Sequence, residues 1–308
     1  GREDVSANDG TGTGVQKGMS LGERYKLRVV SYKDGRRPPP GYKIQWSYTC
    51  TNFYGDHVIG AIRQTGPEVT FKSDDPSICG SYIRFYAHVS HEKGEASLDV
   101  FHHCRFRWFD RKVFEDGLKN RCLTPELFDQ HKTPLCGTAV LVYHLAQKDS
   151  STTYKKLVEF FVTGKTMING RKLSPNPDLY KMLPAVSNTA YPRYDEYSNG
   201  TPIIPPILMH QSDWVAMAGI RSSYNHAYEG KNGEQWDGIN WPSYMKEAIK
   251  DLYSPTEFTD KTSITIGFFI LLDYPEALED MQVAVEDGFK VAVLIDSDML
   301  RGEVSYFV

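Results

Sequence analysis

The sequence is poor in several features that would by themselves assign a protein to a class. Basic residues are not in excess: the net charge is -4 over 308 residues, which argues against a general nucleic-acid-binding protein. The longest apolar run, at 264–272, is too short to span a membrane and contains Thr265 and Gly267. There is no Walker phosphate loop, and the glycine-rich stretch at 10–14 follows no predicted strand, so it does not qualify as a dinucleotide-binding motif. We therefore expect no nucleic-acid partner, no membrane association and no cofactor.

Cysteine is also sparse. The 5 cysteines include no C-x-x-C pair of the kind found in zinc and redox sites. His102 and His103 are adjacent on a predicted strand, so their side chains point to opposite faces and do not readily share one metal. We expect no metal site. Cys50 and Cys79 could meet across a β-fold as a disulfide, but spacing alone does not establish that pairing.

Composition divides the chain into three parts. Residues 1–20 are mostly polar, are rich in Gly, Ser and Thr, and lack the apolar core of a signal peptide, which predicts a flexible linker in a piece of a longer protein. Residues 21–112 show the period-two alternation of half-buried strands, separated by turn residues, and predict an Ig-like β-sandwich that acts as a spacer domain. The predicted strands are 25–30, 44–48, 68–71, 82–89 and 96–101.

The end of this first domain, 101–112, interleaves arginines with aromatic residues. Such a pattern is found where single-stranded nucleic acid stacks on a protein. It is equally typical of a last strand whose aromatic residues pack against the next domain. The acidic balance of the chain favours the packing interpretation.

Residues 113–308 predict a second domain in which helices and strands are mixed, so the whole chain is expected to be an α+β protein. The predicted helices are 134–147, 152–163, 212–223, 242–253 and 275–287, and the predicted strands are 263–271 and 290–295. Residues 173–206 contain many of the prolines and predict an irregular surface segment or a loop that faces a substrate.

The best candidate site is the segment from Gln130 to Gly137. Pro134 suits the first turn of a helix, and Thr133 could cap its free amides, which would place Cys136 in the first turn. The partial positive charge at a helix start favours thiolate over thiol, and the apolar residues at 139–146 predict a central, buried helix. Cys136 is therefore a candidate nucleophile. The alternative is a buried structural cysteine, as most free cysteines are.

Gln130 lies six residues before Cys136. This spacing resembles that of papain-like cysteine peptidases, in which a glutamine upstream of the nucleophile donates to the developing oxyanion. The resemblance implies Cys136 as the nucleophile, Gln130 as the oxyanion donor, and a histidine on a later strand as the base. The sequence departs from that pattern, because the only histidines after Cys136 are His144, His210 and His226 and none follows Val291. The base is left unassigned.

Two longer segments, 213–225 and 289–300, resemble C-terminal toxin modules of bacterial polymorphic toxins, including effectors linked to type VI secretion. That resemblance implies a secreted antibacterial effector, delivered into target cells from an upstream carrier domain or secretion spike and blocked by a cognate immunity protein. In such modules a strand containing His and Trp comes soon after the segment that resembles 296–300. This sequence ends at Val308 without one, so we expect a chain that is truncated, that lacks a segment, or that is not a cysteine hydrolase.

Within the first of these segments, Asp213 is either a catalytic carboxylate or a helix cap. Arg221 and Asn225 stand four residues apart on one helix face and form a candidate substrate clamp. The sequence as a whole therefore predicts a papain-like cysteine hydrolase or acyl transferase acting on an amide bond of a protein or of peptidoglycan. The alternative is a non-enzymatic adaptor or binding module of a secretion system.

Overall fold

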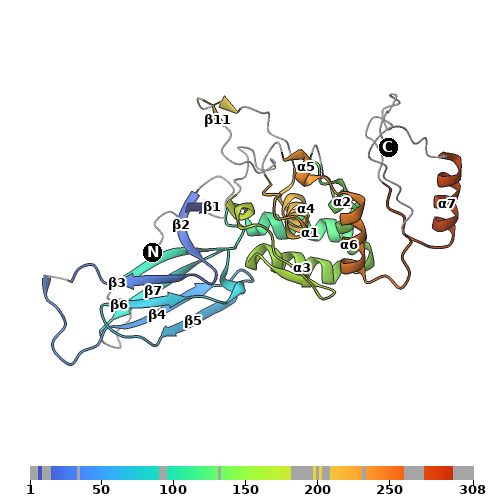
Figure 1. Ribbon diagram of the computed structural model, residues 1–308. Helices are drawn as coiled ribbons and strands as arrows, with labels where there is room; N and C mark the ends of the chain where they lie inside the picture. The colour runs from blue at the N-terminus through green and yellow to red at the C-terminus, as the bar shows by residue number, and fades with distance from the viewer. Residues whose placement is uncertain are drawn as a thin grey trace.

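The computed structural model describes residues 6–8, 15–32, 35–89, 96–130, 133–181, 197–198, 201–202, 209–230, 234–259 and 274–293. The chain is an α+β protein in which a β-rich unit is followed by a helical unit (Figure 1). The strands of the first unit are β1 (Ser6–Asn8), β2 (Val15–Ser20), β3 (Arg24–Arg28), β4 (Gln45–Thr51), β5 (His57–Ile62), β6 (Glu68–Lys72), β7 (Ser81–His88) and β8 (Ala96–His103). A short 3-10 turn, η2 (Pro76–Ile78), precedes β7.

Two sheets form the β-rich unit. One has the order β1-β2-β8-β7-β4-β5, with β2 parallel to β8 and its other pairs antiparallel, and the second is the antiparallel pair β3-β6. The alternation of β7 turns Ile83 and Phe85 inward, where they share a core with Leu27 and Phe71 of the second sheet. The rings of Phe71 and Phe85 meet edge to face at 4.8 Å. The two sheets therefore pack face to face as two layers.

The prediction of a linker over 1–20 needs correction, because β1 and β2 lie within it and Met19 and Ser20 are buried. The glycine-rich composition of 1–20 led to this wrong prediction for a physical reason. Gly18 stands where β2 approaches β8, and a Cβ at that position would overlap the backbone oxygen of Phe101. The glycine that suggested a linker is required for strand pairing. Strand β5 was also not predicted.

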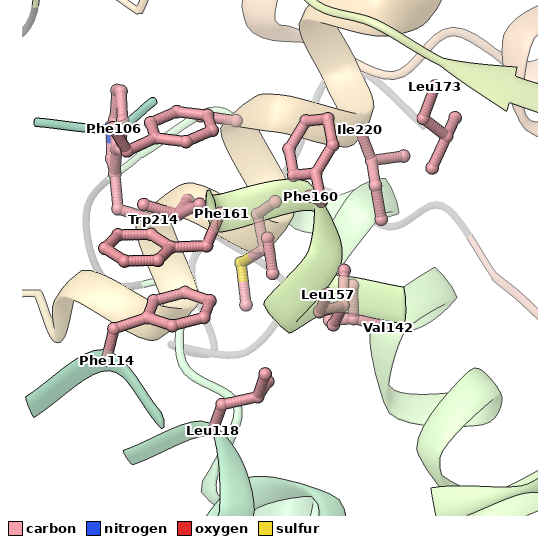
Figure 2. Close-up of a cluster of buried hydrophobic side chains, with 14 of the residues drawn as sticks. Phe106, Phe114, Leu118, Val142, Leu157, Phe160, Phe161, Leu173, Trp214 and Ile220 are labelled. Atoms are coloured by element: carbon pink, nitrogen blue, oxygen red, sulfur yellow. The ribbon is translucent and has the colours of Figure 1, made fainter. Parts of the chain in front are cut away.

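The helical unit contains α1 (Arg111–Leu123), η3 (Pro125–Leu127), α2 (Cys136–Lys148), α3 (Ser150–Thr163), β9 (Thr166–Ile168), β10 (Arg171–Leu173), η4 (Pro177–Lys181), β11 (Tyr197–Ser198), β12 (Thr201–Pro202), α4 (Gln211–Tyr224), α5 (Gln235–Gly238), α6 (Pro242–Tyr253) and α7 (Tyr274–Glu286). Helices α1 to α4 surround a core rich in aromatic residues (Figure 2). The rings of Phe114 and Phe161 stack at 4.1 Å, and those of Phe109 and Trp214 stack at 5.6 Å. Burial of these large rings contributes to the stability of this unit.

The central helix is α4, not α2. Every residue of α4 from Ser212 to Ser222 is buried, and Gly219 is needed because a Cβ there would overlap the ring of Phe160. Helix α2 buries one face only, so the prediction that it is buried all round is wrong. Its buried residues are Gly137, Thr138, Leu141, Val142, Leu145 and Ala146.

The aromatic residues of the segment between the two units pack against the helical unit, which is the interpretation that the acidic composition favoured over nucleic-acid binding. Phe106 and Phe109 are buried in the helical core, where Phe106 contacts Phe160. Arg111, at the start of α1, is buried and donates to the carbonyl oxygens of Pro76 (2.9 Å) and Cys79 (2.7 Å) in the β-rich unit. This arginine therefore joins the two units.

One predicted strand is not found in its described part: residues 290–293 of the strand predicted at 290–295 have no strand, and Val293 is half exposed. Residues 294–295 and the predicted strand at 263–271 lie outside the described residues. The helix predicted at 275–287 is present as α7, which stands apart from the other helices in Figure 1.

Candidate functional site

The start of α2 has only some of the features predicted for a nucleophile site. Cys136 is the first residue of the helix and is partly exposed, whereas Cys50, Cys79, Cys104 and Cys122 are buried. The position before it is Leu135, whose side chain cannot accept a hydrogen bond, and no side chain caps the helix. Amides of an uncapped first turn have no intrahelical acceptor, so they are free to bind an oxygen that carries negative charge.

Thr133 does not cap the helix, which corrects that prediction. Its hydroxyl donates instead to the carbonyl oxygen of Gln130 at 2.6 Å, and its amide donates to the same oxygen at 3.2 Å. The side-chain amide of Gln130 in turn donates to the carbonyl oxygen of Thr133 at 3.4 Å. Gln130 therefore closes the turn that precedes the helix. The described hydrogen bonds of Gln130 lead to Thr133 and not to Cys136.

Asn240 packs against the first turn of α2. A Cβ on Gly137 would overlap both Asn240 and the sulfur of Met245, so this contact requires glycine directly after Cys136. Asn240 is 2% exposed, and its amide nitrogen reaches the carbonyl oxygens of Pro134 and Gly238, each at 3.4 Å. Its side-chain oxygen is buried and has no hydrogen-bond partner among the described residues. Leaving a buried amide oxygen unpaired is costly, which marks this place as unusual.

Sequence reasoning missed Asn240. The only local signal was Pro242, which predicts a helix start and leaves Asn240 as an ordinary residue ahead of it. The contact depends on a long-range approach of the segment before α6 to the start of α2, and sequence spacing carries no information on such an approach.

None of the histidines after Cys136 is hydrogen-bonded to it within the described part of the chain. Nδ1 of His144 pairs with Gln147 on the same helix at 3.2 Å. Nε2 of His226 lies 3.1 Å from the carbonyl oxygen of Ser174. His210 caps α4 by accepting from the amide of Ser212. His131, which precedes Cys136, lies outside the described residues.

Arg221 and Asn225 do not share a helix face as predicted, because α4 ends at Tyr224 and Asn225 is its extended C-cap residue, and both side chains bind the protein itself. Both donate to the carbonyl oxygen of Asp237, at 2.9 Å and 3.2 Å. The guanidinium of Arg221 also lies 4.5 Å from the ring centre of Tyr244 and is almost fully buried, and this burial lowers the pKa of Arg221. These contacts hold the segment that carries Asn240, so the pair positions that segment.

Asp213 is neither a cap nor exposed to a substrate. Both of its carboxylate oxygens bind Arg121 of α1, and the side chain is buried. Burial raises the pKa of Asp213 to about 6, and the charge of Arg121 offsets only part of that rise. Burial, followed by the charge of Arg121, lowers the pKa of His210 to about 4. This cluster fixes α1 against α4.

Two exposed tryptophans stand on either side of Asn240 in sequence. Trp236 is 73% exposed and Trp241 is 44% exposed, and their rings lie parallel with centres 6.3 Å apart. Gly238, between them in sequence, lies directly against Pro134. A Cβ at this position would overlap the proline ring. The aromatic pair therefore lies close to the chain that leads into α2.

Two hollows of the described surface lie elsewhere. One of about 440 Å³ is on the outer face of the β-rich unit, and one of about 70 Å³ is at the junction of the units. Cys136 lines neither of them. Among the described residues there is no group of histidine, cysteine and acidic side chains that could hold a metal, and no helix long and apolar enough to cross a bilayer.

Comparison with known proteins places no name on the site. No protein-family model matches the chain, and no curated protein and no solved structure is significantly similar to it.

Proposed function

We propose that this protein is a cysteine hydrolase or acyl transferase that acts on an amide bond, with Cys136 as its nucleophile. The observation that carries the proposal is the position of Cys136: the first residue of an uncapped helix, partly exposed, with Asn240 packed against the residue that follows. This combination supports the proposal, because the residue that carries the thiol is partly exposed and the uncapped first turn has amides without an intrahelical acceptor.

The chemistry follows from that arrangement. The thiolate of Cys136 adds to the carbonyl carbon of the amide, and the carbonyl oxygen becomes an oxyanion beside the first-turn amides of α2. Collapse of this intermediate breaks the carbon–nitrogen bond, and the amine leaves with one proton. Water, or an acceptor amine in a transferase, then adds to the thioester and releases the thiol. We assign no residue as the proton acceptor.

The finer features are part of the same proposal. We infer an Ig-like β-sandwich spacer and a papain-like second domain, supported by the two-layered β-rich unit and by a cysteine at the start of a helix in the unit that follows. The resemblance of 213–225 and 289–300 to bacterial toxin modules supports a secreted antibacterial effector with a carrier or secretion spike, an immunity protein, and a protein or peptidoglycan substrate. Gln130 remains the proposed oxyanion donor, which requires its amide to leave Thr133 when a substrate binds.

A non-enzymatic binding module is the second candidate. Two observations favour it: no described histidine is hydrogen-bonded to Cys136, and the exposed pair Trp236 and Trp241 offers an aromatic surface nearby. In this case the start of α2 binds a partner and Cys136 carries out no reaction.

Expression of the chain in a bacterial host tests the first proposal against the second. We expect growth inhibition that Cys136→Ala abolishes and that Cys122→Ala retains. Cys122 is the matched control because it is a buried thiol of the same unit, on α1, whose pKa is raised to about 12 by burial. Growth inhibition that survives Cys136→Ala would exclude Cys136 as the nucleophile and leave the binding module.

A further inference from the structure

We propose that the β-rich unit binds a neutral oligosaccharide on its outer face. The site is the hollow of about 440 Å³ described above, whose volume lies within the range of about 300–1,000 Å³ that small-molecule sites have. Residues of β4, β5, β7 and β8 line it, and these strands are neighbours in one sheet (Figure 1). The site belongs to the β-rich unit, so the inference does not rest on the proposed function of Cys136.

The strand register gathers the lining side chains on one face of this sheet. Thr49 of β4 lies opposite Arg84 of β7, which in turn lies opposite Asp99 of β8. Because side chains alternate along a strand, Tyr82 and Tyr86 share the face of Arg84, and the residues between them point into the core of the β-rich unit. The hollow therefore has an ion pair at its centre and a tyrosine on either side of it along β7.

The tyrosines supply aromatic surface. Tyr82 is 48% exposed, although the ring of Phe101 on β8 meets it edge to face at 5.2 Å and restricts its movement. A tyrosine ring has an apolar face and a polar hydroxyl at its edge. A pyranose ring is amphipathic in the same way, since its C–H bonds form an apolar face and its hydroxyls lie around the rim. A fixed, exposed tyrosine is therefore suited to stack on a sugar.

The ion pair supplies polar groups in a fixed plane. Nε and Nη2 of Arg84 donate to the two carboxylate oxygens of Asp99, each at 2.7 Å. These bonds use two of the five guanidinium N–H donors and two of about four carboxylate lone pairs, so the pair has further donors and acceptors. A sugar hydroxyl both donates and accepts, and such a pair can satisfy both needs side by side.

Hydroxyl groups complete the lining. The hydroxyl of Thr49 donates to that of Tyr86 at 3.5 Å. Thr51 of β4 and His57 of β5 are opposed residues at the same hollow, and both are exposed. Hydroxyl and imidazole groups, like the ligand's own hydroxyls, can act as donors or as acceptors.

The charge of the hollow favours a neutral ligand. The hydrogen bond from Arg84 lowers the pKa of Asp99, so both groups are charged at neutral pH and their charges cancel. A phosphate or nucleic acid would meet the carboxylate as well as the guanidinium. A wholly apolar partner would remove water from the ion pair without replacing its hydrogen bonds.

A peptide strand is also disfavoured as the occupant. Peptides that extend a sheet pair with the main chain of an edge strand. The ion pair and the tyrosines instead lie over β7, which is already paired on both sides by β4 and β8. Of these ligand classes, a neutral polyhydroxylated chain is the one that matches both the aromatic and the polar groups.

Calorimetric titration of the full chain tests the inference. The probes are four neutral oligosaccharides (chitohexaose, cellohexaose, maltohexaose and mannohexaose) and, as the anionic comparison, a heparin hexasaccharide. We expect saturable binding of at least one neutral probe with a Kd below about 1 mM, and the probe that binds identifies the sugar. Because a neutral ligand displaces no counterions, its Kd should change less than about twofold between about 50 and 500 mM NaCl.

Variants locate the binding on this face. Tyr82→Ala and Arg84→Met should each weaken it at least about fivefold. Tyr42→Ala is the matched control, since Tyr42 is 62% exposed on the same unit and lines neither hollow, and its Kd should stay within about twofold. Both Tyr82 and Arg84 are exposed, and exposed ion pairs contribute little to stability, so these variants should unfold near the wild-type Tm.

The Cys136→Ala chain separates this inference from the proposed function, because it removes the nucleophile and should bind the sugar as the wild-type chain does. Absence of binding to all four neutral probes at about 5 mM overturns the inference. Binding of heparin alone overturns it as well, since the hollow would then be an anion site. So does a Tyr82→Ala chain that binds as tightly as Tyr42→Ala. The wild-type titration gives an answer even if a variant fails to fold.

Discussion

At the scale of single residues, the site depends on the close approach of Gly137 and Asn240. Cys136 supplies the thiol, but its surroundings are set by the residue after it, which must lack a side chain because Asn240 and Met245 occupy the space. Arg221 and Asn225 hold the segment that carries Asn240 by binding the carbonyl oxygen of Asp237. The side chains expected to clamp a substrate therefore position a residue that the sequence did not single out.

Gly137→Ala tests this contact. The added methyl group overlaps Asn240, so we expect the free energy of unfolding to fall by about 1–3 kcal/mol, measured by urea titration. Asn240→Gly removes the obstructing Cβ, so the double variant Gly137→Ala with Asn240→Gly should be more stable than the sum of the two single effects by at least about 0.5 kcal/mol. Strict additivity would show that the two residues do not share this space.

His210 gives the stability a defined pH dependence. Its pKa is about 4 in the folded protein and near 6.5 when unfolded, so the unfolded chain binds a proton first as the pH falls. Its contribution to stability is therefore complete above pH 6.5 and is lost between about pH 6.5 and 4. Arg121 lies close enough to disfavour the charged ring, and Asp213, whose pKa is raised to about 6, acts in the opposite direction below that pH.

His210→Asn isolates this effect, because asparagine can still cap α4 and does not titrate. We expect the variant to lose less stability than the wild-type protein when the pH is lowered from 6.5 to 4, as measured by urea unfolding at a series of pH values. The contribution of Asp213 is common to both proteins and cancels in the difference. Identical pH profiles would show that the imidazole of His210 does not need to be neutral in the folded state.

At the scale of elements, the local pattern was sufficient for several elements that have one buried and one exposed face. The predicted strand at 82–89 and the predicted helices at 152–163 and 242–253 lie within two residues of β7, α3 and α6. The pattern failed for α1, whose apolar residues are interrupted by buried Arg111 and Glu115, which satisfy each other as an ion pair at 2.8 Å. The pattern also failed for β2, because Gly18 is typical of a linker in the sequence and its role in strand pairing is visible only in the structure.

The candidate site also combines features that local sequence signals predict with features that depend on tertiary contacts. The position of Cys136 at a helix start could be predicted, because Pro134 and the apolar run after it are local signals. The absence of a cap could not be predicted, because the hydroxyl of Thr133 donates to the carbonyl oxygen of Gln130 and the helix begins two residues later than expected. Asn240 depends on tertiary contact alone.

The aromatic core is an element-scale feature whose contribution to the stability of the helical unit can be tested. Phe161 stacks on Phe114 between α1 and α3, and both rings are fully buried (Figure 2). We expect Phe161→Ala to lower the free energy of unfolding by about 3–5 kcal/mol, because it leaves a cavity among residues that cannot collapse into it. The control is Leu123→Ala on α1, where the side chain is 70% exposed and the change should stay within about 0.5 kcal/mol. A loss as small for Phe161→Ala as for the control would contradict this packing.

At the scale of the whole molecule, one arginine joins the β-rich unit to the helical unit. Arg111 pairs with Glu115, donates to the carbonyl oxygens of Pro76 and Cys79, and lies 4.1 Å from the ring centre of Phe53. The orientation of the two units is therefore set by a small cluster of buried contacts.

Arg111→Met tests the junction. It removes the ion-pair partner of buried Glu115, which then keeps only the hydrogen bond from Tyr154, so we expect a loss of about 3–5 kcal/mol and a thermal unfolding curve that separates into two transitions, one for each unit. Lys112→Met is the matched control, since Lys112 forms an exposed pair with Asp116 that contributes at most about 1 kcal/mol. A single unshifted transition in Arg111→Met would show that the junction is held elsewhere.

The central claim is that Cys136 at the start of α2 is the nucleophile of this protein, and its rate of alkylation measures its reactivity most directly. Mass spectrometry of the native chain at pH 7 follows the reaction of Cys136 with iodoacetamide. We predict alkylation of Cys136 several times faster than that of a free model thiol and of the same cysteine in the urea-unfolded chain. A native rate equal to or below both references would contradict the account.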